Sequence, residues 1–147
     1  MECAVMKKIR RQFGLLALGG AGYGAIELLW RGFTHWTMVL TGGFCFSILY
    51  NLCGAMERCR RWQKCLAGSA IITVVEFGVG CLVNLRLKWN VWDYTNVPGN
   101  LLGQICLPFS FVWFLLCAPA TALCDKLRRR EAHSVRALPE GSKARAA

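Results

Sequence analysis

Four long stretches of this 147-residue sequence are almost free of charged side chains. Each is about 18 to 24 residues long, the length that an α-helix needs to cross a hydrocarbon core of about 30 Å at 1.5 Å per residue. The buried helices of a soluble bundle would instead carry a regular polar face toward water. The sequence therefore predicts an all-α, polytopic membrane protein with four transmembrane helices. We expect these helices at residues 13–30, 36–56, 65–85 and 101–124.

The charges are concentrated outside these stretches, although hydrophobic residues make up 55% of the chain and charged residues only 18%. Fifteen of the eighteen lysines and arginines lie before the first stretch, between the second and third, or after the fourth. Because positively charged loops stay on the cytoplasmic side, this pattern predicts a cell-membrane protein with both termini in the cytoplasm. The net charge of +10 then indicates anionic lipid headgroups as partners, and we expect no nucleic-acid partner.

The same pattern divides the chain into three parts. We expect a basic cytoplasmic N-terminus at 1–12, a transmembrane domain at 13–124, and a basic, disordered cytoplasmic tail at 125–147. A signal peptide is an alternative for the first part, because basic residues precede a short apolar segment. We favour a retained helix, since the apolar stretch continues to Trp30 and includes Glu27.

Two glutamates within the apolar stretches, Glu27 and Glu76, are candidate functional residues. A carboxylate at the membrane centre costs about 2.5 to 3.5 kcal/mol on insertion scales, so its presence suggests a function. Arg31 follows Glu27 by one turn in the favourable orientation for an ion pair, which favours a structural role for Glu27. Glu76 has no basic residue within any stretch to pair with. Both a structural role and a proton- or cation-responsive site stay open for it.

Small and polar side chains follow one face of the third stretch. Their spacings of four, three, four and four residues are typical of a single helical stripe, so this face is expected to contact protein rather than lipid. The stripe consists of Ser69, Thr73, Glu76, Gly80 and Asn84.

The external loop between the third and fourth stretches is rich in aromatic residues, including Trp92 and Tyr94 on either side of Asp93. It is long for a simple connection between helices. We expect the loop to fold back onto the helices, with Asp93 accepting hydrogen bonds or pairing with a cation such as Arg31. Asn100 is expected to cap the fourth helix.

Short motifs accompany these residues along the chain. They are Gly22-Tyr23, Ile26-Glu27, Trp30-Arg31-Gly32, His35-Trp36, Gly42-Gly43, the segment Trp92-Asp93-Tyr94-Thr95-Asn96-Val97-Pro98-Gly99-Asn100, and Gly103-Gln104-Ile105-Cys106. Together with Glu76 they resemble the CmpB-like type IV ABC-transporter family of small multi-pass bacterial membrane proteins, over about residues 18–122. In that family the residue after Gly103 is commonly arginine. Here it is Gln104, which puts in doubt any anion contact at this position.

The resemblance implies a permease-like or accessory subunit of an ABC-type transporter, with Glu27, Glu76 and Asp93 lining or closing a polar site. The sequence has no G-x-x-x-x-G-K-[ST] motif, so energy coupling would need a separate ATPase subunit. So small a chain would also need a homo-oligomer or a partner to form a path. The site candidates are Glu27, Arg31, Glu76, Trp92, Asp93, Tyr94, Asn100 and Gln104.

Two other functions remain alternatives. One is a non-transporting scaffold or regulatory subunit, and the less favoured one is an intramembrane enzyme that acts on lipid. No nucleophile–base pair and no metal-ligand spacing stands out in the sequence. We therefore expect no enzymatic activity, no catalytic residue, no metal and no cofactor.

Overall fold

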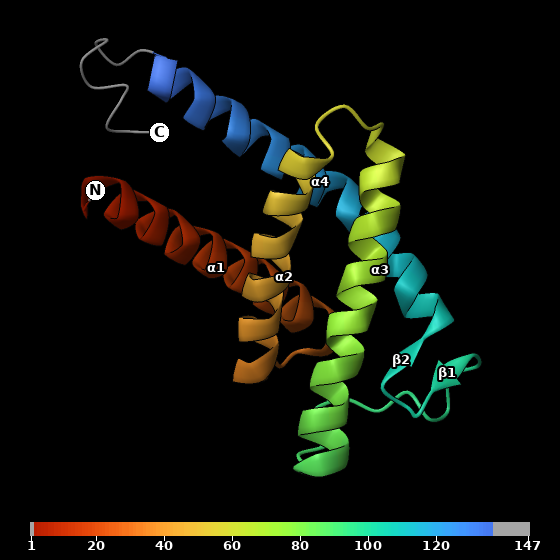
Figure 1. The fold of residues 1–147 in the computed structure, drawn as a ribbon. Coiled ribbons are helices and arrows are strands. Elements are labelled where there is room, and N and C mark those ends of the chain that lie inside the picture. The colour runs from red at the N-terminus through yellow and green to blue at the C-terminus, as the bar shows by residue number, and fades with distance from the viewer. Residues whose placement is uncertain (1, 137–147) are drawn as a thin grey trace.

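The computed structural model describes residues 2–136, which form four long helices and one short hairpin (Figure 1). All four helices are long and apolar enough to cross a membrane, as the charge-free stretches predict. In chain order the elements are α1 (Glu2–Arg31), α2 (Trp36–Ala55), α3 (Arg61–Gly80), the π-helical turn η1 (Cys81–Arg86), β1 (Asn100–Leu101), β2 (Ile105–Cys106) and α4 (Leu107–Arg136).

The N-terminus of α1, the α2–α3 turn and the C-terminal part of α4 lie at one end of the bundle, which we call the basic end (Figure 1). The short α1–α2 turn and the segment that connects η1 to α4 lie at the opposite end, which we call the hairpin end. Gly32 forms the turn after α1 with a positive φ of 77°, a conformation that glycine adopts without strain at a helix C-terminus.

Glycines allow α1 and α2 to pack backbone against backbone. A Cβ added at Gly19 would lie 2.3 Å from Cβ of Phe46, and one added at Gly43 would lie 2.5 Å from the carbonyl oxygen of Leu16. Small residues permit such close approach between helices in lipid, where the hydrophobic effect does not drive association. Gly19 and Gly20 of the first span therefore pack against α2, whereas Gly14 and Gly22 do not.

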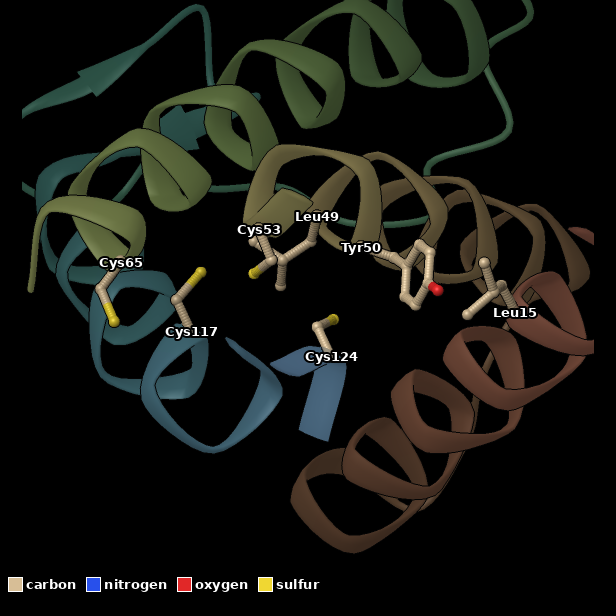
Figure 2. Close-up of a cluster of buried hydrophobic side chains, with 7 residues drawn as sticks. All are labelled: Leu15, Leu49, Tyr50, Cys53, Cys65, Cys117 and Cys124. Atoms are coloured by element: carbon tan, nitrogen blue, oxygen red, sulfur yellow. The ribbon is translucent and has the colours of Figure 1, made fainter. Parts of the chain in front are cut away.

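Cysteines contribute much of the largest core cluster (Figure 2). Cys53 and Cys124 are 0% exposed and Cys117 is 1% exposed. The cluster joins all four helices, with small apolar thiols from α2, α3 and α4 and a leucine from α1. The cysteines in it are free. Its members are Leu15, Leu49, Tyr50, Cys53, Cys65, Cys117 and Cys124.

The start of the fourth helix differs from our expectation. α4 begins at Leu107 rather than at residue 101, because residues 100–106 form an antiparallel hairpin in which Leu101 pairs with Ile105. Leu102 has a positive φ of 53° and cannot continue a right-handed helix.

The end of the fourth helix also differs. α4 continues to Arg136, so the disorder expected from residue 125 is wrong for residues 125–136. Contacts at the basic end hold this extension: Glu131 accepts hydrogen bonds from the hydroxyl of Tyr50 at 2.7 Å and from Arg11 at 3.3 Å. The rest of the expected tail, 137–147, lies outside the described residues.

Candidate functional site

Glu27 is held in an ion pair at the hairpin end of α1. Arg31 Nη2 donates to Glu27 Oε1 at 2.6 Å, and the hydroxyl of Thr34 donates to the other carboxylate oxygen. Arg31 Nη1 also donates to the carbonyl of Val91 at 3.0 Å, which ties α1 to the external loop. Both oxygens of Glu27 are thus occupied, as a structural role requires.

Glu76 lies on α3 with 4% of its surface exposed. Its Oε2 accepts a hydrogen bond of 2.8 Å from the indole of Trp113 on α4. Its Oε1 has no hydrogen-bond partner among the described residues. The ion pairs formed within residues 2–136 join Arg11 to Glu131, Arg31 to Glu27 and Lys64 to Asp125, and none includes Glu76.

The polar stripe on α3 faces protein, as its spacing predicts. Ser69, Glu76, Gly80 and Asn84 are buried, and half-buried Thr73 donates to the hydroxyl of Ser110 on α4 at 3.3 Å. The stripe therefore places Glu76 at the contact between α3 and its neighbours.

Aromatic rings surround the Glu76 carboxylate. The rings of Tyr23 on α1 and Trp113 on α4 stack with centroids 5.6 Å apart. Tyr94 approaches from the external loop, and its ring stacks on Phe109 at 4.7 Å. Burial raises the pKa of Tyr94 above its usual range, and the nearby negative charge of Glu76 raises it further. The Tyr94 phenol is therefore a neutral group at physiological pH.

A cavity of about 320 Å³ adjoins this carboxylate and is lined by residues of all four helices. Its walls are apolar almost throughout, with Leu18 and Gly22 from α1 and Leu116 and Ala120 from α4. Among the described residues that line it, Glu76 is the sole carboxylate, and none is basic. The cavity therefore combines an apolar interior with one acidic side chain.

The external loop docks onto the bundle as expected. Trp92 is 8% exposed, and its indole donates to the carbonyl of Gln104 at 2.8 Å. The Gln104 side chain in turn accepts from Asn84 at 2.8 Å and donates to the carbonyl of Leu102 at 2.9 Å. Gln104 thus belongs to a buried neutral network, and a neutral amide suits this role.

Of the eight candidate residues Glu76 alone lines the cavity, and Asp93 and Asn100 hold turns of the external loop. Asp93 is exposed and accepts hydrogen bonds from the backbone and hydroxyl of Thr95 at 2.8 and 3.1 Å. Asp93 thus accepts hydrogen bonds, which is one of the two expected alternatives, whereas the expected alternative of a pair with Arg31 is not formed. Its exposed carboxylate closes a local turn, so the expectation that it lines the polar site is wrong.

Asn100 does not cap α4, which begins several residues later. Its side chain donates to the carbonyls of Thr95 and Val97 at 3.1 and 2.8 Å and accepts from the backbone of Gly103 at 3.0 Å. It therefore fixes the hairpin that the sequence did not reveal.

Sequence reasoning missed Trp113 and Tyr23. Trp113 lies in the middle of the fourth apolar stretch, whereas membrane tryptophans are usually found at the interfaces. This unusual position could have indicated that the Trp113 indole is a buried hydrogen-bond donor. Within residues 2–136, no group of three or more His, Cys, Asp or Glu side chains is placed to hold a metal ion.

The comparisons with known proteins agree with the motifs and the fold. A family model with the description "Putative ABC-transporter type IV" matches residues 23–140, more than half of the chain. No curated protein and no solved structure matches the chain. The protein is therefore a multi-pass membrane protein related to ABC transporters, and it belongs to the CmpB family that this model describes.

Proposed function

We propose that this protein is a permease-like or accessory membrane subunit of an ABC-type transporter, and that Glu76 is its acidic site. The observation that carries the proposal is the buried Glu76 carboxylate, which has one unpartnered oxygen and adjoins a cavity. An ionisable side chain inside a membrane-spanning helix costs free energy, and such side chains are typical of substrate or ion pathways. Glu27 is fully paired with Arg31 and Thr34 and supports the fold beside this site.

The proposal assigns ATP hydrolysis to a separate subunit, since the chain has no phosphate-binding loop motif. It places the basic end in the cytoplasm, by the distribution of lysine and arginine, and the protein in the plasma membrane. A homo-oligomer would complete a path that four helices enclose poorly. We propose no enzymatic activity for the chain.

Anionic lipid headgroups are the proposed partners of the basic end. A second cavity, of about 520 Å³, opens there between α3 and α4. Its lining includes Arg61, Lys126, Arg129 and Arg130, beside Asp125, which is paired with Lys64. Each basic residue near an anionic surface contributes about 1 kcal/mol of attraction. The cavity thus suits a phosphate group at the membrane surface.

A scaffold or regulatory subunit is the second candidate. The hydrogen bond from Trp113 to Glu76 favours it, because this contact also fixes α3 against α4 without any transport role. The two candidates differ in what Glu76 does for an assembled transporter.

The test is to cross-link and purify the tagged chain from its native membranes and to identify a co-purifying subunit that carries a phosphate-binding loop. The purified complex should hydrolyse ATP, and Glu76→Gln should change the rate by several-fold. Glu57→Gln, at an exposed residue of the α2–α3 turn, is the matched control and should have no effect.

Two results would count against the transporter role. If hydrolysis is the same in the Glu76→Gln and wild-type complexes while the variant melts at a lower temperature, Glu76 serves the scaffold alone. If no ATPase subunit accompanies the chain, the association with an ABC-type complex is wrong.

A further inference from the structure

We propose that the cavity beside Glu76 binds a hydrophobic organic cation. The inference rests on the proposed function, since it takes the acidic site of that proposal and names the class of molecule that it holds. It concerns equilibrium binding to this chain, which can be measured without an ATPase partner.

The cavity has the size and position of a ligand site. Its volume of about 320 Å³ falls within the range of sites that hold drug-sized molecules, roughly 300 to 1,000 Å³. It lies between helices that cross the membrane, and residues of α1 and α4 make up much of its lining. A Cβ added at Gly22 would meet no atom within 4 Å, so the wall at this residue faces open space.

The charge of the lining selects a cation. Glu76 is the one acidic side chain in the described lining, and no lysine or arginine of the lining opposes it. A carboxylate in an apolar interior is stabilised by an opposite charge placed close to it, since the low dielectric weakens screening. An anion in the same cavity would be repelled by the carboxylate. A neutral molecule would leave the carboxylate without a counter-charge.

The aromatic rings strengthen the same preference. Tyr23 and Trp113 both line the cavity and stack at 5.6 Å beside Glu76. The faces of such rings attract cations, and the attraction is greatest where water is excluded. Aromatic faces with one carboxylate and apolar walls form a set of groups that recognises a bulky, weakly hydrated cation rather than a small metal ion.

The experiment uses purified wild-type protein in nanodiscs and two radiolabelled ions of equal shape and opposite charge, tetraphenylphosphonium and tetraphenylborate. Binding to empty nanodiscs is subtracted. We expect saturable binding of the phosphonium and no saturable binding of the borate. Glu76→Gln keeps the shape of the side chain and should weaken phosphonium binding by about tenfold or more, since it removes the counter-charge.

A pair of glycine variants tests the place of binding. Gly22→Leu adds bulk at the wall of the cavity and should abolish phosphonium binding. Gly14→Leu is its matched control, because a Cβ at Gly14 also meets no atom within 4 Å but this residue does not line the cavity. If Glu76→Gln does not fold, the two glycine variants and the two wild-type binding isotherms still test the inference.

Three results would overturn the inference. The first is equal binding of the borate and the phosphonium, which would show an apolar cavity without charge selection. The second is equal binding in the Gly22→Leu and Gly14→Leu variants. The third is no saturable binding of either ion, as expected where lipid acyl chains fill the cavity. None of these results would contradict the proposed association with an ATPase subunit, because that association is measured in a separate experiment.

Discussion

The indole nitrogen of Trp113 donates a 2.8 Å hydrogen bond to the Glu76 carboxylate and so joins the middle of α4 to α3. Trp113 is 9% exposed and Glu76 is 4% exposed, so the bond is shielded from bulk water. The same indole stacks on Tyr23 of α1. One tryptophan therefore connects three helices around the acidic group.

The first prediction concerns this bond. Trp113→Phe should lower the free energy of unfolding by about 1 to 3 kcal/mol, because it leaves a buried acceptor without its donor. The same substitution in a Glu76→Met background, which has no acceptor for the indole, should cost less. A double-mutant cycle from denaturant unfolding in detergent measures this coupling.

The control for the cycle is Trp62→Phe, since Trp62 is 55% exposed near the start of α3. It should have little effect in either background. Additive effects of Trp113→Phe and Glu76→Met would show that the bond contributes nothing to stability.

The sequence was sufficient for the features that depend on local spacing. Charge-free stretches predicted four spans, and a separation of four residues predicted the pair of Glu27 and Arg31. Helical periodicity predicted the buried stripe of α3. Each of these can be inferred from neighbours within one or two turns.

Other features depend on contacts between residues far apart in the chain. The bond between Trp113 and Glu76 joins two helices across 37 positions, and no local pattern indicates which donor a buried carboxylate will meet. The continuation of α4 rests on Glu131 contacting Tyr50, 81 positions away. In isolation the basic composition of this region resembled a disordered tail.

The second prediction concerns the docking of the external loop. Arg31→Met removes the donor to Val91 and the partner of Glu27, so residues 87–100 should exchange backbone hydrogen faster. Hydrogen–deuterium exchange with mass spectrometry can follow peptides from this segment. Arg86→Met, at an exposed arginine, is the control and should leave exchange unchanged. Equal exchange in the two variants would mean that other contacts hold the loop.

The third prediction concerns alkaline pH and Tyr94. The pKa of Tyr94 is raised by burial and by Glu76, so the unfolded chain loses this proton at a lower pH than the folded chain does. The stabilising contribution is fully present below the unfolded pKa of about 10 and is lost as the pH rises through the folded pKa. Wild type should therefore lose melting temperature above pH 10 relative to Tyr94→Phe. Parallel curves for the two proteins would contradict the raised pKa.

The fourth prediction concerns orientation. Asn96→Cys places a thiol on the exposed external loop, whereas the exposed Cys59 lies in the α2–α3 turn at the basic end. On intact cells a membrane-impermeant maleimide should label Asn96→Cys in a Cys59→Ser background, and it should not label wild type. Cell lysis should expose Cys59 of wild type to the reagent. Labelling of wild type but not of Asn96→Cys on intact cells would reverse the orientation.

The last prediction concerns the ion pair between Lys64 on α3 and Asp125 on α4. Lys64 Nζ lies 3.0 Å from Asp125 Oδ1, and the lysine side chain is 6% exposed while the aspartate is 26% exposed. Asp125→Asn should therefore be strongly destabilising, because it leaves a buried ammonium without a counter-charge. Lys64→Asp alone should destabilise as well, since it places two carboxylates together. Combining Lys64→Asp with Asp125→Lys restores opposite charges, and it moves the acid to the first turn of α3, where the helix dipole favours a negative charge. The exchanged pair should therefore recover most of the melting temperature that Lys64→Asp alone loses in detergent. If the double variant melts as low as the worse single variant, side-chain packing around Lys64 rather than its charge stabilises the contact between the two helices.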